Sequence, residues 1–218
     1  MEKIYLHAIN ANSRSYISVN TRNILKSILQ DGSLLSLRLQ RKFELGFSFS
    51  GMDFVSLCDY DRREIVSNED ETYNSFNGYI RNSLSLAFDK ENLDVITPNI
   101  VAVSNRSYGG YLNMQRLGNY NTTNTRYSDM PDEVQVRDRV PLEEMVAVTF
   151  PTHLLVHTFQ NDQTNADMVM YEVDAIESLL RRYKHDVPIY DIDTFKDLRI
   201  NDNAYDICKN IKQLKKRR

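Results

Sequence analysis

Apolar residues recur along the chain in short runs that predict β-strands. Three of these runs are mostly apolar and rich in Ile, Val, Leu and Phe, as buried strands are: residues 4–9, 54–58 and 146–150. Two further segments, 83–88 and 133–136, alternate between apolar and polar side chains, which is typical of half-buried strands. Residues 94–103, interrupted by Pro98, and residues 187–192 complete an inventory of six or seven short strands.

Apolar residues spaced three and four positions apart predict helices between these strands. The clearest helix covers residues 165–184, with one apolar stripe made by Val169, Val173, Ile176, Leu180 and Tyr183. A last amphipathic helix covers residues 203–214, through Ala204, Ile207, Ile211 and Leu214. Both helices are expected to bury their stripe against the core or a partner.

The first helix has recognisable start and stop signals. It runs through Ile24, Leu25, Ile28 and Leu29, and either Asn20 or Thr21 is expected to cap it. Gly32 is expected to end it, because glycine adopts the left-handed conformation that closes a helix. Residues 140–145 predict a single helical turn, and residues 33–50 fit a helix or a strand.

Two irregular stretches separate the predicted elements. Residues 59–77 hold six acids and are expected to form a surface loop. Residues 105–131 hold three of the seven glycines, and a loop of this length is usually functional or disordered. The strands and helices do not alternate as βαβα, so the predicted fold class is α+β.

Charge divides the chain into an acidic body and a basic tail. The net charge is −3, but the last eleven residues carry six Lys/Arg and no acid, which leaves 21 basic and 30 acidic residues elsewhere. The body, near −9, is therefore not a general binder of nucleic-acid backbones. With only Cys58 and Cys208, a zinc site built from cysteines and a disulfide framework are both excluded.

The N-terminus and the hydropathy pattern bear on the compartment. No apolar signal region follows Met1, and no apolar run approaches the roughly 20 residues of a membrane span. We therefore expect a soluble protein that is cytoplasmic, or exported without a signal peptide, and that has no membrane partner.

Strong catalytic motifs are absent from the sequence. There is no glycine-rich phosphate loop, no His-Glu-x-x-His, no Gly-x-Ser-x-Gly and no Cys-x-x-Cys. His153 and His157 are four residues apart but have no acidic ligand in register, so no metal site is predicted.

What remains is an order of elements over residues 1–150. A strand with His7 precedes a helix that ends at Gly32, and a strand containing Val55-Ser56 follows. After the irregular loop come Glu133-Val134-Gln135-Val136 and then Val140-Pro141-Leu142-Glu143-Glu144-Met145. This order resembles the ADP-ribosyltransferase-like superfamily, especially its bacterial toxin, DarT-like and RNA 2′-phosphotransferase branches.

The resemblance implies a fold and a division of the chain. Residues 1–150 would form an α+β core with a split β-sheet and flanking helices. Residues 151–218 would be a C-terminal helical extension, packed on that core and ending in a basic amphipathic helix.

The resemblance also implies roles for particular residues. Glu133 would be the catalytic carboxylate, with NAD as the substrate bound by His7, Ser56 and Tyr79. Arg126 and Tyr127, in the irregular loop, would meet the acceptor. The residues themselves support the placement of Glu133, because strand alternation turns Glu133 and Gln135 away from the face of Val134 and Val136.

The sequence departs from the family pattern in two places. Pro131 stands two residues before Glu133, where family members often carry a second polar residue, and this argues against modification of arginine. Ala8 and Ile9 follow His7 in place of the usual His-x-Thr.

Three functions stay open at this point. The leading hypothesis is an NAD-dependent ADP-ribosyltransferase, either a toxin or effector or a housekeeping enzyme, acting on a protein or nucleic-acid acceptor. The alternative is a non-catalytic interaction or nucleic-acid-binding protein on a degenerate version of the fold, suggested by the basic tail. A 2′-phosphotransferase would need a set of Arg and His phosphate ligands, which the sequence does not identify.

Overall fold

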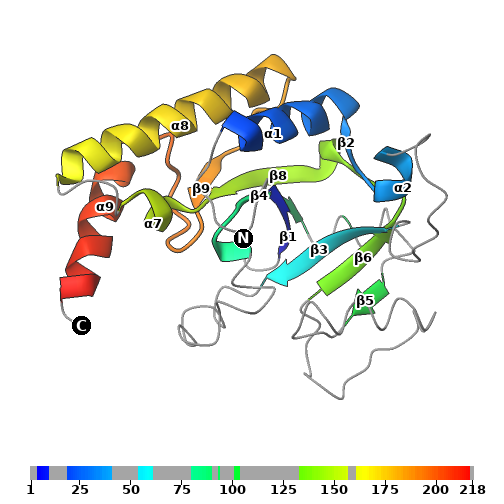
Figure 1. Ribbon diagram of the computed structural model, residues 1–218, viewed down its shortest axis with the longest axis horizontal. Helices are drawn as coiled ribbons and strands as arrows, with labels where there is room; N and C mark the ends of the chain where they lie inside the picture. Colours follow the sequence, from blue (N-terminus) through cyan, green and yellow to red (C-terminus); the bar gives the residue numbers. More distant parts are fainter. Residues whose placement is uncertain are drawn as a thin grey trace. The chain divides into compact units, whose positions relative to one another are not determined.

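The computed structural model describes residues 4–9, 19–40, 54–60, 80–89, 93, 101–103, 133–156 and 161–216 (Figure 1). The chain forms two compact units, between which it passes repeatedly. Unit 1 contains Met1–Ala8, Asp31–Ile80 and Ala87–Met145, and unit 2 contains Ile9–Gln30, Arg81–Leu86 and Val146–Arg218. The predicted division into residues 1–150 and 151–218 stays a prediction.

Four antiparallel strands form the sheet of unit 1. They are β1 (Ile4–Ile9), β3 (Phe54–Tyr60), β5 (Val101–Val103) and β6 (Glu133–Arg137). Hydrogen bonds join them in the order β5-β6-β3-β1 (Figure 1). Strand β3 is buried on both faces, since Leu57 and Cys58 are both fully buried although they alternate in direction.

A second, two-stranded sheet follows β6 directly. It pairs β2 (Ser33–Leu35) with β7 (Arg139–Pro141), which leads into the 3₁₀ helix η3 (Leu142–Glu144). Asp138, at φ 66°, turns the chain between β6 and β7, and its carbonyl accepts a 2.8 Å hydrogen bond from the Ser36 amide. This pairing fixes the chain at the C-terminal end of β6.

A βαβ crossover organises unit 2. Strands β8 (Met145–Phe150) and β9 (Ile189–Asp191) pair in parallel, and α7 (Thr152–Leu155) and α8 (Asp162–Arg182) connect them. A parallel pair needs such a crossover, because a tight turn can join only antiparallel strands.

The long helix α8 carries the apolar stripe that the sequence predicts. Its residues Val169, Val173, Ile176 and Leu180 are all buried. Helix α9 (Asn201–Lys216) packs against it (Figure 1). Helix α1 (Val19–Asp31) forms an ion pair with it between Arg22 and Glu172. The predicted burial of the stripe is confirmed for these four residues, but Tyr183, its fifth predicted member, is half-buried and follows the last residue of α8.

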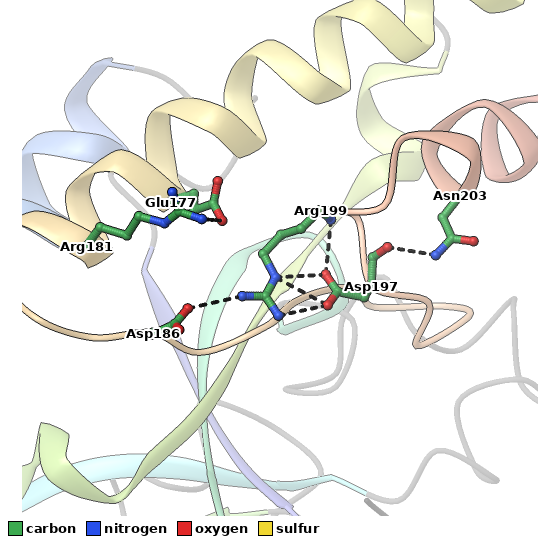
Figure 2. Close-up of polar contacts among 6 residues, drawn as sticks. All are labelled: Glu177, Arg181, Asp186, Asp197, Arg199 and Asn203. Carbon is green, nitrogen blue, oxygen red and sulfur yellow. Dashed lines mark hydrogen bonds and ion pairs between the residues drawn. The ribbon is translucent and has the colours of Figure 1, made fainter.

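A polar network connects the segment after β9 to the start of α9 (Figure 2). The Arg199 guanidinium lies 2.9 Å from Oδ2 of Asp197 and 3.4 Å from Oδ1 of Asp186. The Asn203 side chain donates a 2.8 Å hydrogen bond to the Asp197 carbonyl. Burial by itself raises the pKa of Asp197, but the hydrogen bonds and charge of Arg199 outweigh it, so the pKa is lowered.

The structure corrects two details of the sequence predictions and settles a third that the sequence left open. Helix α1 begins at Val19, so Asn20 and Thr21 lie inside its first turn and neither is its N-cap. Strand β4 (Leu84–Asp89) was expected to be half-buried, but its residues 84–88 are all buried. Residues 33–40, which fitted helix or strand, form β2 and then α2 (Leu37–Gln40).

The other predicted elements agree with the structure where it describes them. Gly32 ends α1 with a left-handed φ of 65°, and the predicted strands around β1, β3, β6, β8 and β9 are confirmed. The predicted loop at 105–131 and all but two residues of the loop at 59–77 lie outside the described residues. The class is α+β, as predicted. No helix in the described part of the chain is both long and apolar enough to cross a bilayer.

Candidate functional site

The register between β3 and β6 determines which residues share a face of the unit 1 sheet. Ser56 pairs directly with Gln135, and Cys58 pairs with Glu133. Residues directly opposite each other in an antiparallel pair lie on the same face, and residues two apart on one strand do as well. Ser56, Cys58, Glu133 and Gln135 therefore belong to one face, which we call the Glu133 face.

The opposite face of these two strands is apolar. It contains Val55, Leu57, Val134 and Val136. Val55, Leu57 and Val136 are almost fully buried, at 3%, 0% and 2% exposure. The prediction that Val136 turns toward the core is thus confirmed. Glu133 lies on the other face, as the alternation indicates.

Glu133 lies in a row that crosses four strands. Leu6 of β1 pairs with Cys58 of β3, and Cys58 pairs with Glu133 of β6. Glu133 in turn pairs with Val103 of β5. Leu6 and Cys58 are fully buried. Glu133 is the first residue of β6, so a fixed strand position carries the predicted catalytic carboxylate.

The register brings Ser56 and Glu133 to one face but does not bring His7 there. His7 follows Leu6 in β1, and because Leu6 belongs to the Glu133 face, His7 belongs to the opposite one. The side chain of His7 is half-buried and has interactions of its own. Tyr79, Arg126 and Tyr127 lie outside the described residues. The roles given to all these residues stay predictions.

The Glu133 face can do particular chemistry. A carboxylate on a strand can stabilise positive charge that develops on a sugar ring, and it can orient a hydroxyl group. Ser56 and Gln135 add neutral groups that donate and accept hydrogen bonds. Among the residues that the structure describes, no group of three His, Cys, Asp or Glu is arranged to hold a metal ion.

Unit 2 contains a second polar cluster, centred on Asp193. Nε of Arg81 donates a 2.7 Å hydrogen bond to Oδ1 of Asp193. Nδ1 of His153 lies 3.1 Å from Oδ2 of the same carboxylate, without the alignment of a hydrogen bond. Nε2 of His153 lies 3.0 Å from Oδ1 of Asn82. The cluster joins the segment after β9 to α7 and to the residues before β4.

Two neighbouring side chains, His153 and Arg81, determine the ionisation of Asp193. Burial by itself raises the pKa of this carboxyl, but the contacts with His153 and Arg81 and their charges outweigh burial and lower it to about 2. Asp193 is therefore ionised over the whole physiological range, and it depends on these partners for compensation of its buried charge.

A neighbouring carboxyl, Asp191, is perturbed in the opposite direction. It is fully buried, and this burial raises its pKa despite hydrogen bonds from the Thr194 amide at 2.8 Å and the Thr194 hydroxyl at 2.7 Å. Both bonds go to Oδ2. Oδ1 has no hydrogen-bond partner among the described residues, although the Thr152 side chain lies near enough to stabilise the charge. Asp191 thus closes the turn that presents Asp193.

We predict that Asp193→Asn destabilises the protein at neutral pH by about 2 kcal/mol, since a pKa lowered from 3.8 to about 2 corresponds to that linkage energy. A lowered pKa contributes stability that is present above pH 4 and is lost as the pH falls toward 2. The difference in unfolding free energy between wild type and variant should therefore shrink over that range. Urea titrations from pH 2 to 7 measure it.

Asp186→Asn is the control, because this side chain is 86% exposed. It should change the unfolding free energy by less than about 0.5 kcal/mol. A difference between Asp193→Asn and wild type that stayed constant from pH 7 to pH 2 would contradict the prediction.

The sequence draws attention to only one member of this cluster, His153, through its spacing of four residues from His157. His157 lies outside the described residues. The closely spaced Asp191, Asp193 and Thr194 were the available signal, since such residues favour hydrogen-bonded turns. Nothing local indicates that Arg81 pairs with Asp193, 112 residues away.

Comparison with protein-family models and with curated proteins gives no match. Two solved structures are similar to the chain. One is Thermus sp. 2.9 DarT in complex with NAD+, at 12% identity and a TM-score of 0.39, covering 85% of this chain and 94% of DarT. The other is the same protein in complex with carba-NAD+, at 11% identity and a TM-score of 0.40, covering 86% and 92%.

Proposed function

We propose that this protein is an NAD-dependent ADP-ribosyltransferase in which Glu133 is the catalytic carboxylate. The observation that carries the proposal is the β3–β6 register, which places Glu133 and Ser56 on one face and apolar residues on the other. The order of elements over residues 1–150 supports the same reading. The acceptor is a macromolecule, either a protein or a nucleic acid.

The proposed reaction breaks one bond and forms one bond at the anomeric carbon C1′ of the nicotinamide ribose. The electron pair of the C1′–nitrogen bond leaves with nicotinamide, and C1′ becomes oxocarbenium-like. The Glu133 carboxylate stabilises this positive charge. A nucleophilic atom of the acceptor then bonds to C1′ and gives up its proton. In this proposal Glu133 accepts the proton, as carboxylates do in glycosyl transfer.

The proposed NAD contacts do not have equal support. Ser56 lies on the Glu133 face, so it is the first contact to test by substitution. His7 lies on the other face of its strand, and its proposed contact with NAD rests on the resemblance alone. Tyr79 as an NAD contact, and Arg126 and Tyr127 as acceptor contacts, also rest on the resemblance.

Incubation of the purified protein with a cell extract and NAD labelled in its adenylate half tests the proposal. We expect label to appear on a macromolecule, together with release of nicotinamide. Digestion of the product with protease or nuclease identifies the class of acceptor. A wild-type protein that neither transfers label nor hydrolyses NAD would contradict the proposal.

A non-catalytic interaction protein is the second candidate, and the position of His7 off the Glu133 face favours it. Such a protein would gain no thermal stability from NAD. If the interaction is with nucleic acid, binding should weaken with salt and disappear when residues 209–218 are deleted, because those residues carry the basic tail. Stabilisation by NAD that disappears in His7→Ala would count against this candidate.

A further inference from the structure

The Glu133 face carries a cation as well as an acid. Along β6, Glu133, Gln135 and Arg137 alternate with Val134 and Val136, so all three polar residues lie on the Glu133 face. Their partners on β3 are Cys58, Ser56 and Phe54, in that order. The polar row thus follows one strand and has Ser56 beside its middle.

The charges on this face are sparse. The register of β1, β3, β5 and β6 assigns eleven residues of their paired segments to this face, and only Glu133 and Arg137 among these eleven are charged. Arg137 is the last residue of β6, and Asp138 follows it with a left-handed φ of 66°. The pairing of β2 with β7 fixes the chain just beyond this point.

We propose that Arg137 binds the diphosphate of NAD, so that the dinucleotide lies along β6 with its reacting ribose at Glu133. This inference rests on the proposed function and names a residue that the sequence resemblance does not assign. Of the groups that NAD presents, the diphosphate alone carries negative charge, and the guanidinium group is the side chain best matched to it.

Charge and spacing both support this placement. The body of the protein carries a net charge near −9, so a bound diphosphate needs a local cation. Four residues of strand place Glu133 and Arg137 about 13 Å apart at Cα. In NAD the ribose ring and its 5′ carbon separate the reacting carbon from the diphosphate. The side chains of Glu and Arg are long enough for one to reach the reacting carbon while the other reaches the diphosphate of the same NAD molecule.

The test is the affinity of the purified protein for ADP-ribose, measured by calorimetry in wild type and in Arg137→Gln. We expect the substitution to weaken binding about 10- to 100-fold, as loss of a charge-assisted contact does. The KM for NAD should rise by a similar factor, with a smaller change in kcat. Nicotinamide riboside has no diphosphate, so wild type and variant should bind it equally.

Arg139→Gln is the matched control, because Arg139 belongs to β7 and is exposed. It makes the same chemical change two residues away and should leave ADP-ribose binding unchanged. Arg137→Lys keeps the charge and should bind with intermediate affinity, and its salt dependence should resemble that of wild type. It guards against the possibility that Arg137→Gln fails to fold.

The outcomes separate this inference from the proposed function. Suppose that wild type cleaves NAD, but that Arg137→Gln and Arg137→Lys bind ADP-ribose as tightly as Arg139→Gln does. The proposed role of Arg137 is then overturned, while the proposed function of the protein as an ADP-ribosyltransferase stands. Equal weakening for ADP-ribose and nicotinamide riboside would also overturn it. If wild type binds neither ADP-ribose nor NAD, both proposals fail.

Discussion

Replacing Glu133 by Gln is expected to lower the rate of NAD cleavage by about 10²- to 10³-fold, the usual effect of removing one preorganised electrostatic contact to a transition state. Glutamine keeps the shape of the side chain but lacks the charge that opposes an oxocarbenium-like ribose. Affinity for NAD should change little, so the loss should fall on kcat. Release of nicotinamide, followed at saturating NAD, measures it.

The control for this substitution is Glu143→Gln. Glu143 is an exposed acid of η3 in the same unit, so its replacement makes the same chemical change away from the Glu133 face. It should cleave NAD at the wild-type rate. Full activity in Glu133→Gln would remove Glu133 from the mechanism.

The largest effect on stability is expected from Ile176→Ala. Ile176 is fully buried in the apolar stripe of α8, the helix that α9 packs against. Removing three carbons there loses transfer free energy and leaves a cavity, at a cost of about 3 kcal/mol. For a chain of this length, that corresponds to a fall in Tm of roughly 10 °C. Urea denaturation and thermal unfolding both measure the loss.

Tyr171→Ala is the control on the same helix, because Tyr171 is 68% exposed. It removes a larger side chain but should change the unfolding free energy by less than about 0.5 kcal/mol. Comparable losses in the two variants would mean that α8 does not bury the face containing Ile176.

The elements that the sequence predicted well have local causes. The stripe of α8 was readable because a helix repeats every 3.6 residues, and β6 was readable because Glu133, Val134, Gln135 and Val136 alternate. Gly32 was recognised as the end of α1 because its left-handed conformation has a specific sequence preference. Each of these signals lies within a few residues.

The elements predicted poorly depend on contacts between distant segments. Leu84 to Phe88 read as half-buried because Ser85 is polar, yet tertiary packing covers both faces of β4. The start of α1 was misplaced because several residues near Val19 can cap a helix, and helix boundaries are less well specified than helix interiors.

The sequence predicted candidate residues for the site better than it predicted which of them share a face of the sheet. Alternation alone turned Glu133 away from Val134 and Val136. Alternation also puts Arg137 on the face of Glu133, but only the register shows that Ser56 shares this face and that His7 does not. Register is set by pairing between strands far apart in sequence, and a shift of one residue would exchange the two faces.

The central claim is that the Glu133 face binds and cleaves NAD. Its most direct test is nicotinamide release from NAD by purified wild type, run beside Glu133→Gln at the same concentration of folded protein. We predict release by wild type, faster in the presence of cell extract, and at least 100-fold slower release by the variant. No release by wild type in the presence of extract, or equal release by both proteins, would contradict the claim.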